Sequence, residues 1–131
     1  MSAARLDILI EQGVDLPISF SYTADDGTQP NLTSYFAKLQ VRTDYSAVDA
    51  ALSLDQTNGI ALGDLGYGTA SISAAQAASL GVDYTQVKYV VDGLKCVKFG
   101  VWDLEIKSPA GKVTRLLAGD VYVAPSATKG I

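Results

Sequence analysis

The chain has 131 residues, a formal charge of −4 and 48% hydrophobic residues, which suits one ordered domain with one hydrophobic core. Its ten Lys and Arg are not clustered, so nucleic acid is not expected as a partner. No apolar run approaches the roughly 20 residues of a membrane span and no signal peptide is recognisable, so we expect no membrane partner and a chain made and kept in a cytoplasm.

Three stretches in the first third of the chain alternate apolar and polar residues, as half-buried strands do. They are residues 6–10, 16–22 and 36–42. Pro17 lacks a donor for a ladder hydrogen bond, so the second stretch either starts near it or lies at a sheet edge. Asp25-Asp26-Gly27 predicts a turn between the second and third stretches.

Shorter elements are expected in the middle of the chain. Residues 50–54 predict a short strand, although a helical turn also suits them, and a turn at Asn58-Gly59 precedes brief strands at 60–62 and 69–73. Ser73 and Gln76 have capping-box spacing. We therefore expect one short helix at 74–80, stopped by Gly81.

Residues 82–98 predict an extra β-arm. Apolar residues alternate up to Asp92-Gly93, which is a strong hairpin signal, so residues 94–99 should fold back on residues 85–91. This arm is the natural place for contacts with a partner. The candidate interaction residues are Tyr84, Val87, Tyr89, Val91, Leu94 and, outside the arm, Tyr67.

The longest alternating pattern is a hairpin over residues 99–123. In its first strand Trp102, Leu104 and Ile106 should face the core, with Asp103 and Glu105 on the opposite face. Ser108-Pro109-Ala110-Gly111 supplies the reversal. The second strand is expected to place on one face Val113, Arg115, Leu117, Gly119, Val121 and Val123.

Seven or eight short strands with closely spaced turns and one short helix predict an all-β fold. We expect an antiparallel β-sandwich of immunoglobulin-like architecture, with a partly open barrel as the alternative. Cys96 is the only cysteine, so an intrachain disulfide is excluded. The expected organisation is a single domain over residues 1–131, with the inserted arm near 82–98 and a flexible tail at 126–131.

The residues offer little for catalysis. Without histidine the commonest general base and metal ligand are missing, so we expect no enzyme activity, no cofactor and no metal site. Cys96, beside Lys95 and Lys98, is interpreted as a buried structural thiol. Asp103 and Glu105 could in principle act as a glycosidase pair, but their alternation is typical of a solvated strand face.

Other motifs are interpreted as turns. Asp25-Asp26-Gly27 and Asp64 lack the spacing of a calcium loop, and the glycines of residues 63–68 lack the order of a dinucleotide fingerprint. The Asn31-Leu32-Thr33 sequon carries little weight without an export signal.

The aromatic residues leave a second interpretation open. Tyr22, Tyr35 and Trp102 are expected in the core or at its rim. A surface set is a possible platform for stacking sugars, and its members are Tyr45, Tyr67, Tyr84, Tyr89 and Tyr122. The alternative function is therefore a carbohydrate- or receptor-binding module.

Residues 16–42, 58–80 and 102–125 carry turn and packing signatures in a characteristic order. These signatures are Asp26-Gly27 with Leu32-Thr33, Lys38 and Arg42, Asn58-Gly59-Ile60, Gly68-Thr69-Ala70, and Asp103-Leu104-Glu105-Ile106 with Val113-Thr114-Arg115-Leu116-Leu117. The order resembles a group of small virion proteins of tailed phages and prophages, akin to the amino-terminal β-sandwich of the upper baseplate protein. Residues 81–98 are longer than the connection expected in that group.

The resemblance implies a non-enzymatic structural component of a bacteriophage particle, at the tail, baseplate or neck or as a capsid decoration. Its location would be the virion, assembled in the cytoplasm of the bacterial host. Its partners would be other virion proteins and further copies of the same chain, in repeated copy-to-copy contacts.

Overall fold

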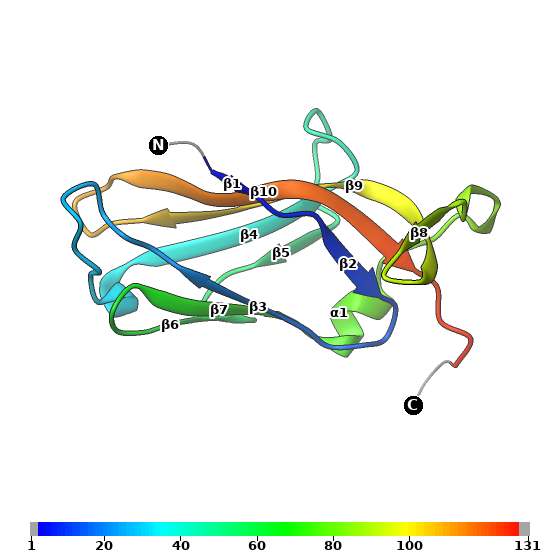
Figure 1. Ribbon diagram of the computed structural model, residues 1–131, viewed down its shortest axis with the longest axis horizontal. Coiled ribbons are helices and arrows are strands. Elements are labelled where there is room, and N and C mark those ends of the chain that lie inside the picture. The colour runs from blue at the N-terminus through cyan, green and yellow to red at the C-terminus, as the bar shows by residue number, and fades with distance from the viewer. Residues whose placement is uncertain (1–2, 129–131) are drawn as a thin grey trace.

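The computed structural model describes residues 3–128, which form two facing β-sheets (Figure 1). The larger sheet has the order β1 (Ala4–Arg5), β10 (Val113–Ala124), β9 (Leu94–Lys107), β4 (Phe36–Arg42), β5 (Leu52–Leu54), with β2 (Ile8–Glu11) also on β10 and β8 (Tyr89–Val91) also on β9. The smaller sheet has the order β3 (Leu16–Ser21), β7 (Tyr67–Ile72), β6 (Ile60–Leu62). The helical elements are η1 (Leu32–Ser34), α1 (Ala74–Ala78) and η2 (Tyr84–Gln86).

The predicted all-β sandwich is confirmed. A β3–β7–β6 sheet packed against a β10–β9–β4–β5 sheet is the strand arrangement of immunoglobulin-like domains. The fold is reached without a disulfide, since Cys96 is a free, buried thiol. Packing of the two inner faces therefore replaces the covalent link between sheets.

The pairing of the N-terminal strands differs from a purely antiparallel sandwich. Both β1 and β2 run parallel to β10, with Ile8 opposite Val121 and Ile10 opposite Val123. The parallel direction arises because the chain continues from β2 into β3 of the other sheet, so it has no hairpin with β10. The remaining strand pairs are antiparallel.

The core lies between the sheets and is filled by the predicted inward faces of β4 and β9. Trp102, Leu104 and Ile106 are at most 1% exposed. Ala37 and Leu39 are fully buried opposite them on β4. Because apolar side chains alternate with polar ones along both strands, each strand buries one face and exposes the other.

A bulge in β10 corrects the predicted face of its first residues. Arg115 pairs with Glu105 but Leu117 pairs with Leu104, so one extra residue, Leu116, is accommodated between them. An extra residue reverses the inward and outward alternation. Val113 and Arg115 are consequently exposed, whereas the second half of the strand keeps its predicted inward face.

Three other boundaries differ from the prediction. Leu6 is 42% exposed because the first strand is interrupted there, between β1 and β2. The helix ends at Ala78, before Gly81, although the predicted capping box of Ser73 is present. In the first half of the arm only Tyr89–Val91 is a strand, paired with the start of β9. Of the predicted flexible tail, residues 129–131 lie outside the described residues.

A hydrogen bond inside the larger sheet fixes the N-terminal strand. The indole Nε1–H of Trp102 donates to the carbonyl oxygen of Leu6 at 2.8 Å, and the Asp7 carboxylate accepts the backbone N–H of Asp120 at 2.9 Å. Gly119 permits this approach, because a Cβ there would collide with the Leu6 carbonyl. The interruption between β1 and β2 is therefore held by specific contacts of Leu6 and Asp7, and we call this segment the joint.

Replacing Trp102 tests this joint. Trp102→Phe keeps most of the ring but leaves the Leu6 carbonyl without its donor, and should lower the free energy of unfolding by about 1–3 kcal/mol. Trp102→Ala also empties the core and should cost about 3–5 kcal/mol. Denaturant titration measures both. A Phe variant as stable as the native chain would show that the hydrogen bond contributes nothing.

Gly119→Ala tests the close approach independently. The added methyl group must displace Leu6, at a cost of about 1–3 kcal/mol, and amide exchange should accelerate in β2. Gly81→Ala is the matched control, since nothing lies within 4 Å of its Cβ position. Equal melting temperatures for the two variants would contradict the proposed contact.

Candidate interaction surface

The arm, residues 82–98, projects from one end of the sandwich (Figure 1). Asp83 begins η2 by accepting hydrogen bonds from the backbone N–H and hydroxyl of Thr85, at 2.9 and 2.7 Å. The chain then reverses at Asp92 and Gly93, with φ of 50° and 78°. Two consecutive positive φ values are what a two-residue hairpin turn requires, so the predicted Asp-Gly hairpin is confirmed.

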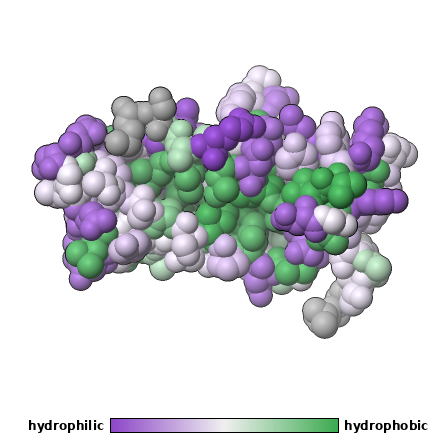
Figure 2. Space-filling model, viewed as in Figure 1, coloured by the Kyte–Doolittle hydropathy of each residue, from purple (hydrophilic) through white to green (hydrophobic). Residues whose placement is uncertain are grey.

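Aromatic and aliphatic side chains of the arm are exposed to solvent. The exposed fractions are 42% for Tyr89, 38% for Leu94 and 63% for Tyr84. Val87 and Val91 are half-buried, and Val87 packs against the core. Figure 2 shows a hydrophobic patch at this end of the molecule, over the hairpin of β8 and β9. The arm therefore gathers five of the six predicted interaction residues.

Val90 is the most exposed hydrophobic residue of β8, at 67%, and the sequence prediction missed it. It pairs with Lys95, on the face opposite that of Tyr89 and Val91. The prediction took the alternating residues Val87, Tyr89 and Val91 and left out the residues between them. The face that carries Tyr89 and Val91 is partly covered by the sandwich, whereas the face that carries Val90 and Lys95 points into solvent.

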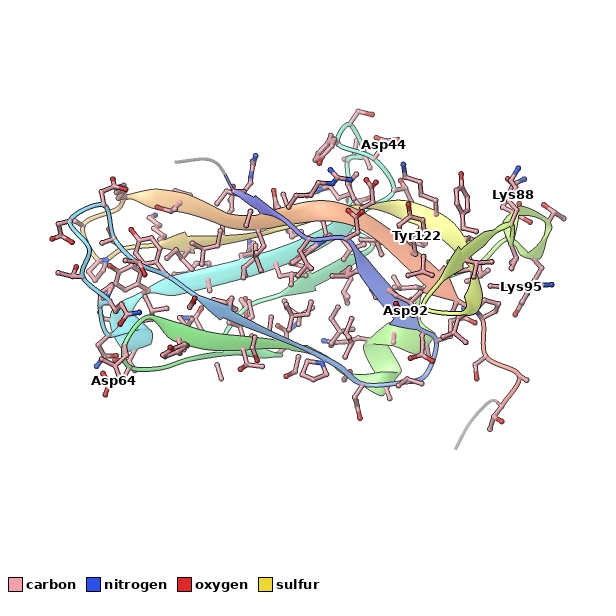
Figure 3. All side chains as sticks on the ribbon, viewed as in Figure 1. Asp44, Asp64, Lys88, Asp92, Lys95 and Tyr122 are labelled. Carbon is pink, nitrogen blue, oxygen red and sulfur yellow. The ribbon has the colours of Figure 1, made fainter. Side chains whose placement is uncertain are left out.

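Tyr67 lies elsewhere. It begins β7, and its backbone N–H donates to the carbonyl of Asp64, which lies at the opposite end of the molecule from Lys88 and Asp92 (Figure 3). There Tyr67 is 57% exposed and lines a groove beside β3. The arm and Tyr67 are therefore separate surfaces.

A groove of about 410 Å³ adjoins the arm. Its lining residues come from the arm, the β2–β3 turn and the segment after β10, and include Val14, Leu94 and Pro125. Gln12, a lining residue, links the segment after β10 to the end of the α1 segment, because its side chain accepts from the N–H of Ser126 at 3.4 Å and donates to the carbonyl of Leu80 at 2.8 Å. The groove at the base of the arm thus has a mixed lining, with Glu11 and Lys95 beside its apolar residues.

An aromatic contact attaches the arm to the sandwich, and a sulfur contact joins the two strands of the arm. The rings of Tyr89 and Tyr122 meet edge to face, with centroids 5.7 Å apart. Cys96 is fully buried, and its Sγ lies 3.7 Å from the carbonyl oxygen of Tyr89. Burial raises the pKa of the Cys96 thiol, although Lys95 and Lys98 are close to it in sequence. The interpretation of this cysteine as a buried structural thiol fits that environment.

Asp103 and Glu105 lie on the outer face of the larger sheet, as predicted. Both make ion pairs with Arg115, at 3.2 and 3.5 Å. Partial burial, and secondarily the charge of Glu105, raise the pKa of Asp103. A hollow of about 230 Å³ beside them is bordered by Arg42, whose guanidinium is already bonded to the carbonyls of Ala47 and Val48. The carboxylates therefore have structural partners.

The surface tyrosines do not form one platform. Tyr45 is 75% exposed in the loop after β4, and Tyr67 lies beside β3. Tyr89 and Tyr122 share a ring contact at the arm, away from both of these positions. Trp102 and Tyr22 are buried, as predicted.

The acidic turns have a common structure. In each one an aspartate accepts hydrogen bonds from the backbone N–H and the hydroxyl of the residue two positions later, and the four are Asp26, Asp44, Asp55 and Asp83. These bonds lower the pKa of each carboxyl below its usual 3.8. Asn31 likewise caps η1. Local turn and cap structure thus accounts for the acidic motif at Asp25-Asp26-Gly27, which forms the predicted turn, and for the Asn31-Leu32-Thr33 sequon.

Neither a metal site nor a spanning helix emerges within residues 3–128. No group of three or more Cys, Asp or Glu side chains there could hold a metal ion. No helix in the same range is long and apolar enough to cross a membrane.

Comparison with known proteins gives structural likenesses only. No protein-family model matches the chain, and no curated protein matches its sequence. Among solved structures, it is similar to the NK cell receptor NKp44, with 13% identity and a TM-score of 0.45 over 96% of this chain and 100% of that one.

Two further structures are similar at the same level. They are the first immunoglobulin-like domain of human CD48, with 8% identity and a TM-score of 0.41 over 100% of this chain and 91% of that one, and Tim-1, with 9% identity and a TM-score of 0.42 over 98% and 100%. TM-scores this low support no argument about function. The assignment of the sandwich depends on the strand pairing itself.

Thiol labelling tests the anchoring of the arm. Because Cys96 is buried with a raised pKa, the native protein should react slowly with a thiol reagent, and the rate should keep rising with pH above the ordinary thiol range. The denatured chain should react at the rate of a free cysteine. Equal native and denatured rates would show that β8 detaches readily from Tyr122.

Proposed function

We propose that this chain is a non-enzymatic structural component of a bacteriophage particle, at the tail, baseplate, neck or capsid surface. It works through contacts with further copies and with other virion proteins, and it is assembled into the virion in the host cytoplasm. The observation that carries the proposal is the projecting arm, whose exposed apolar residues Tyr89, Val90 and Leu94 are fixed to a rigid sandwich. That the partners belong to a phage particle is inferred from the resemblance of this chain to small virion proteins, which covers residues 16–42, 58–80 and 102–125.

The arm has the properties of a protein-binding surface. Its aromatic residues offer large contact areas at low conformational cost, because Tyr89 is already held against Tyr122. The arm also carries three lysines and two aspartates within a chain of charge −4. The net charge of the arm is therefore positive, whereas that of the rest of the chain is negative. This difference favours contact with an acidic neighbour, including another copy.

The alternative function, carbohydrate or receptor binding, receives less support. A sugar platform needs several aromatic faces directed to one place. The described tyrosines are instead distributed over the loop after β4, the groove beside β3 and the arm. A glycan array with the Tyr67→Ala and Tyr84→Ala variants would detect such a module.

Particle composition tests the proposal. Particles purified from the source phage or induced prophage should contain the chain, visible as a sandwich in electron cryo-microscopy. A Val90→Asp, Leu94→Asp double variant should reduce incorporation roughly 30-fold, the effect of losing one interface hot spot of about 2 kcal/mol.

Val48→Asp is the matched control, because Val48 is 92% exposed in the loop after β4, outside the arm. It should be incorporated like the native chain. Absence of the chain from every particle would overturn the proposed function. Normal incorporation of the double variant would show that the arm is not the contact.

A further inference from the structure

The smaller sheet has an open edge at β3. In the immunoglobulin fold strands A, B, E and D form one sheet, and here β3, β7 and β6 take the positions of B, E and D. The N-terminal strands β1 and β2 pair with β10 in the other sheet instead. Among the described strands, β3 consequently pairs with β7 alone, and the A position beside it is vacant.

The main chain of β3 directs hydrogen-bonding groups into that vacancy. The N–H of Tyr22 donates to the carbonyl of Gly66 on the β7 side. Because successive residues of a strand alternate in direction, the main-chain groups of Pro17, Ser19 and Ser21 point away from β7. Proline has no N–H, and an outward position is where a strand tolerates it. Ser19 and Ser21 present both donors and acceptors.

An apolar groove accompanies the edge. It has a volume of about 440 Å³ and lies between β3, the start of β7, the N-terminal strand and β10. Its lining residues are all uncharged, and they are Ala4, Leu6, Ser19, Phe20, Ser21, Tyr67, Leu116 and Leu117. Figure 2 shows the corresponding hydrophobic band between the N-terminal strands and β3.

The absence of charged side chains on β3 indicates what kind of strand can pair with its edge. Exposed edge strands are usually protected by lysines, yet no charged residue occurs between Leu16 and Ala24, and Pro17 is the only protecting residue. A charged strand would bring an unpaired charge into the groove. Two copies of a chain with charge −4 repel each other over most of their surface, but not where both edges are neutral. The neutral β3 of another copy satisfies both conditions.

We propose that the β3 edge binds a second copy of this chain, with the two β3 strands antiparallel about a two-fold axis. With Ser19 opposite the partner's Ser21, each outward N–H meets a carbonyl, and the two smaller sheets become one continuous sheet. This contact is distinct from the arm. It deepens the proposed function, on which it rests for its biological setting, by naming one of the copy-to-copy contacts.

Substitutions in β3 test the interface on the purified full chain. Ser19→Pro removes an outward N–H without breaking a bond to β7, and Ser21→Lys adds a charge at the edge. Sedimentation velocity over a concentration series should show a dimer for the native chain, and each variant should weaken it by about tenfold or more. In the two-fold dimer Ser19→Pro removes two hydrogen bonds and Ser21→Lys places two like charges at the interface.

Ser19→Ala, which keeps the N–H, and Val48→Lys, which adds a charge far from β3, should dimerise like the native chain. Amide exchange of Ser19 and Ser21 should slow as the native concentration rises. A native chain that stays monomeric, or a dimer that neither variant weakens, overturns the interface. Should Ser19→Pro fail to fold, Ser21→Lys decides alone.

The outcomes separate this inference from the proposed function. A dimer that depends on β3, in a chain absent from particles, would overturn the particle role and keep the interface. If the chain is incorporated into particles but both variants leave the dimer intact, the particle role is kept and the β3 interface is overturned.

Discussion

The hydrogen bond from the Trp102 indole to the Leu6 carbonyl joins the N-terminal segment to the centre of the larger sheet, where β1 and β2 pair with β10. The indole is 1% exposed, so its N–H must find an acceptor inside the protein or lose the free energy of a hydrogen bond. Leu6 supplies that acceptor only because Gly119 has no side chain in the way. Once β1 and β2 are held along β10, no described residue is left to pair with the outer edge of β3.

The arm depends on the same long strand as the core. β9 begins in the arm at Leu94 and continues through Trp102 to Lys107, so a single strand links the hairpin to the centre of the sandwich. Buried Cys96 and Val97 mark the transition between these two parts. Because the anchor is part of the core, the exposed residues of β8 keep a fixed orientation relative to the body. A surface fixed in this way loses little conformational entropy when it binds.

The elements that could be predicted from the sequence are those determined by residues close together in the chain. Alternation specified β4 completely, and the spacing of Ser73 and Gln76 identified the helix cap. Strand period does not specify a strand's partner, so the parallel pairing of β1 and β2 could not be predicted. The bulge at Leu116 left no trace in the alternation, since adjacent leucines at 116 and 117 fit either face. The arm was found through Asp92-Gly93, but the open β3 edge is a property of the whole topology.

The four aspartate turns give the loops resistance to mild acid. A carboxylate that accepts both a backbone N–H and a hydroxyl is stabilised in its charged form, so Asp26, Asp44, Asp55 and Asp83 hold their protons less tightly than an unfolded chain would. Their contribution to stability is complete above the usual carboxyl pKa and is lost as the pH falls through each lowered pKa. The outer loops therefore keep their shape in conditions under which ordinary aspartates have already begun to titrate.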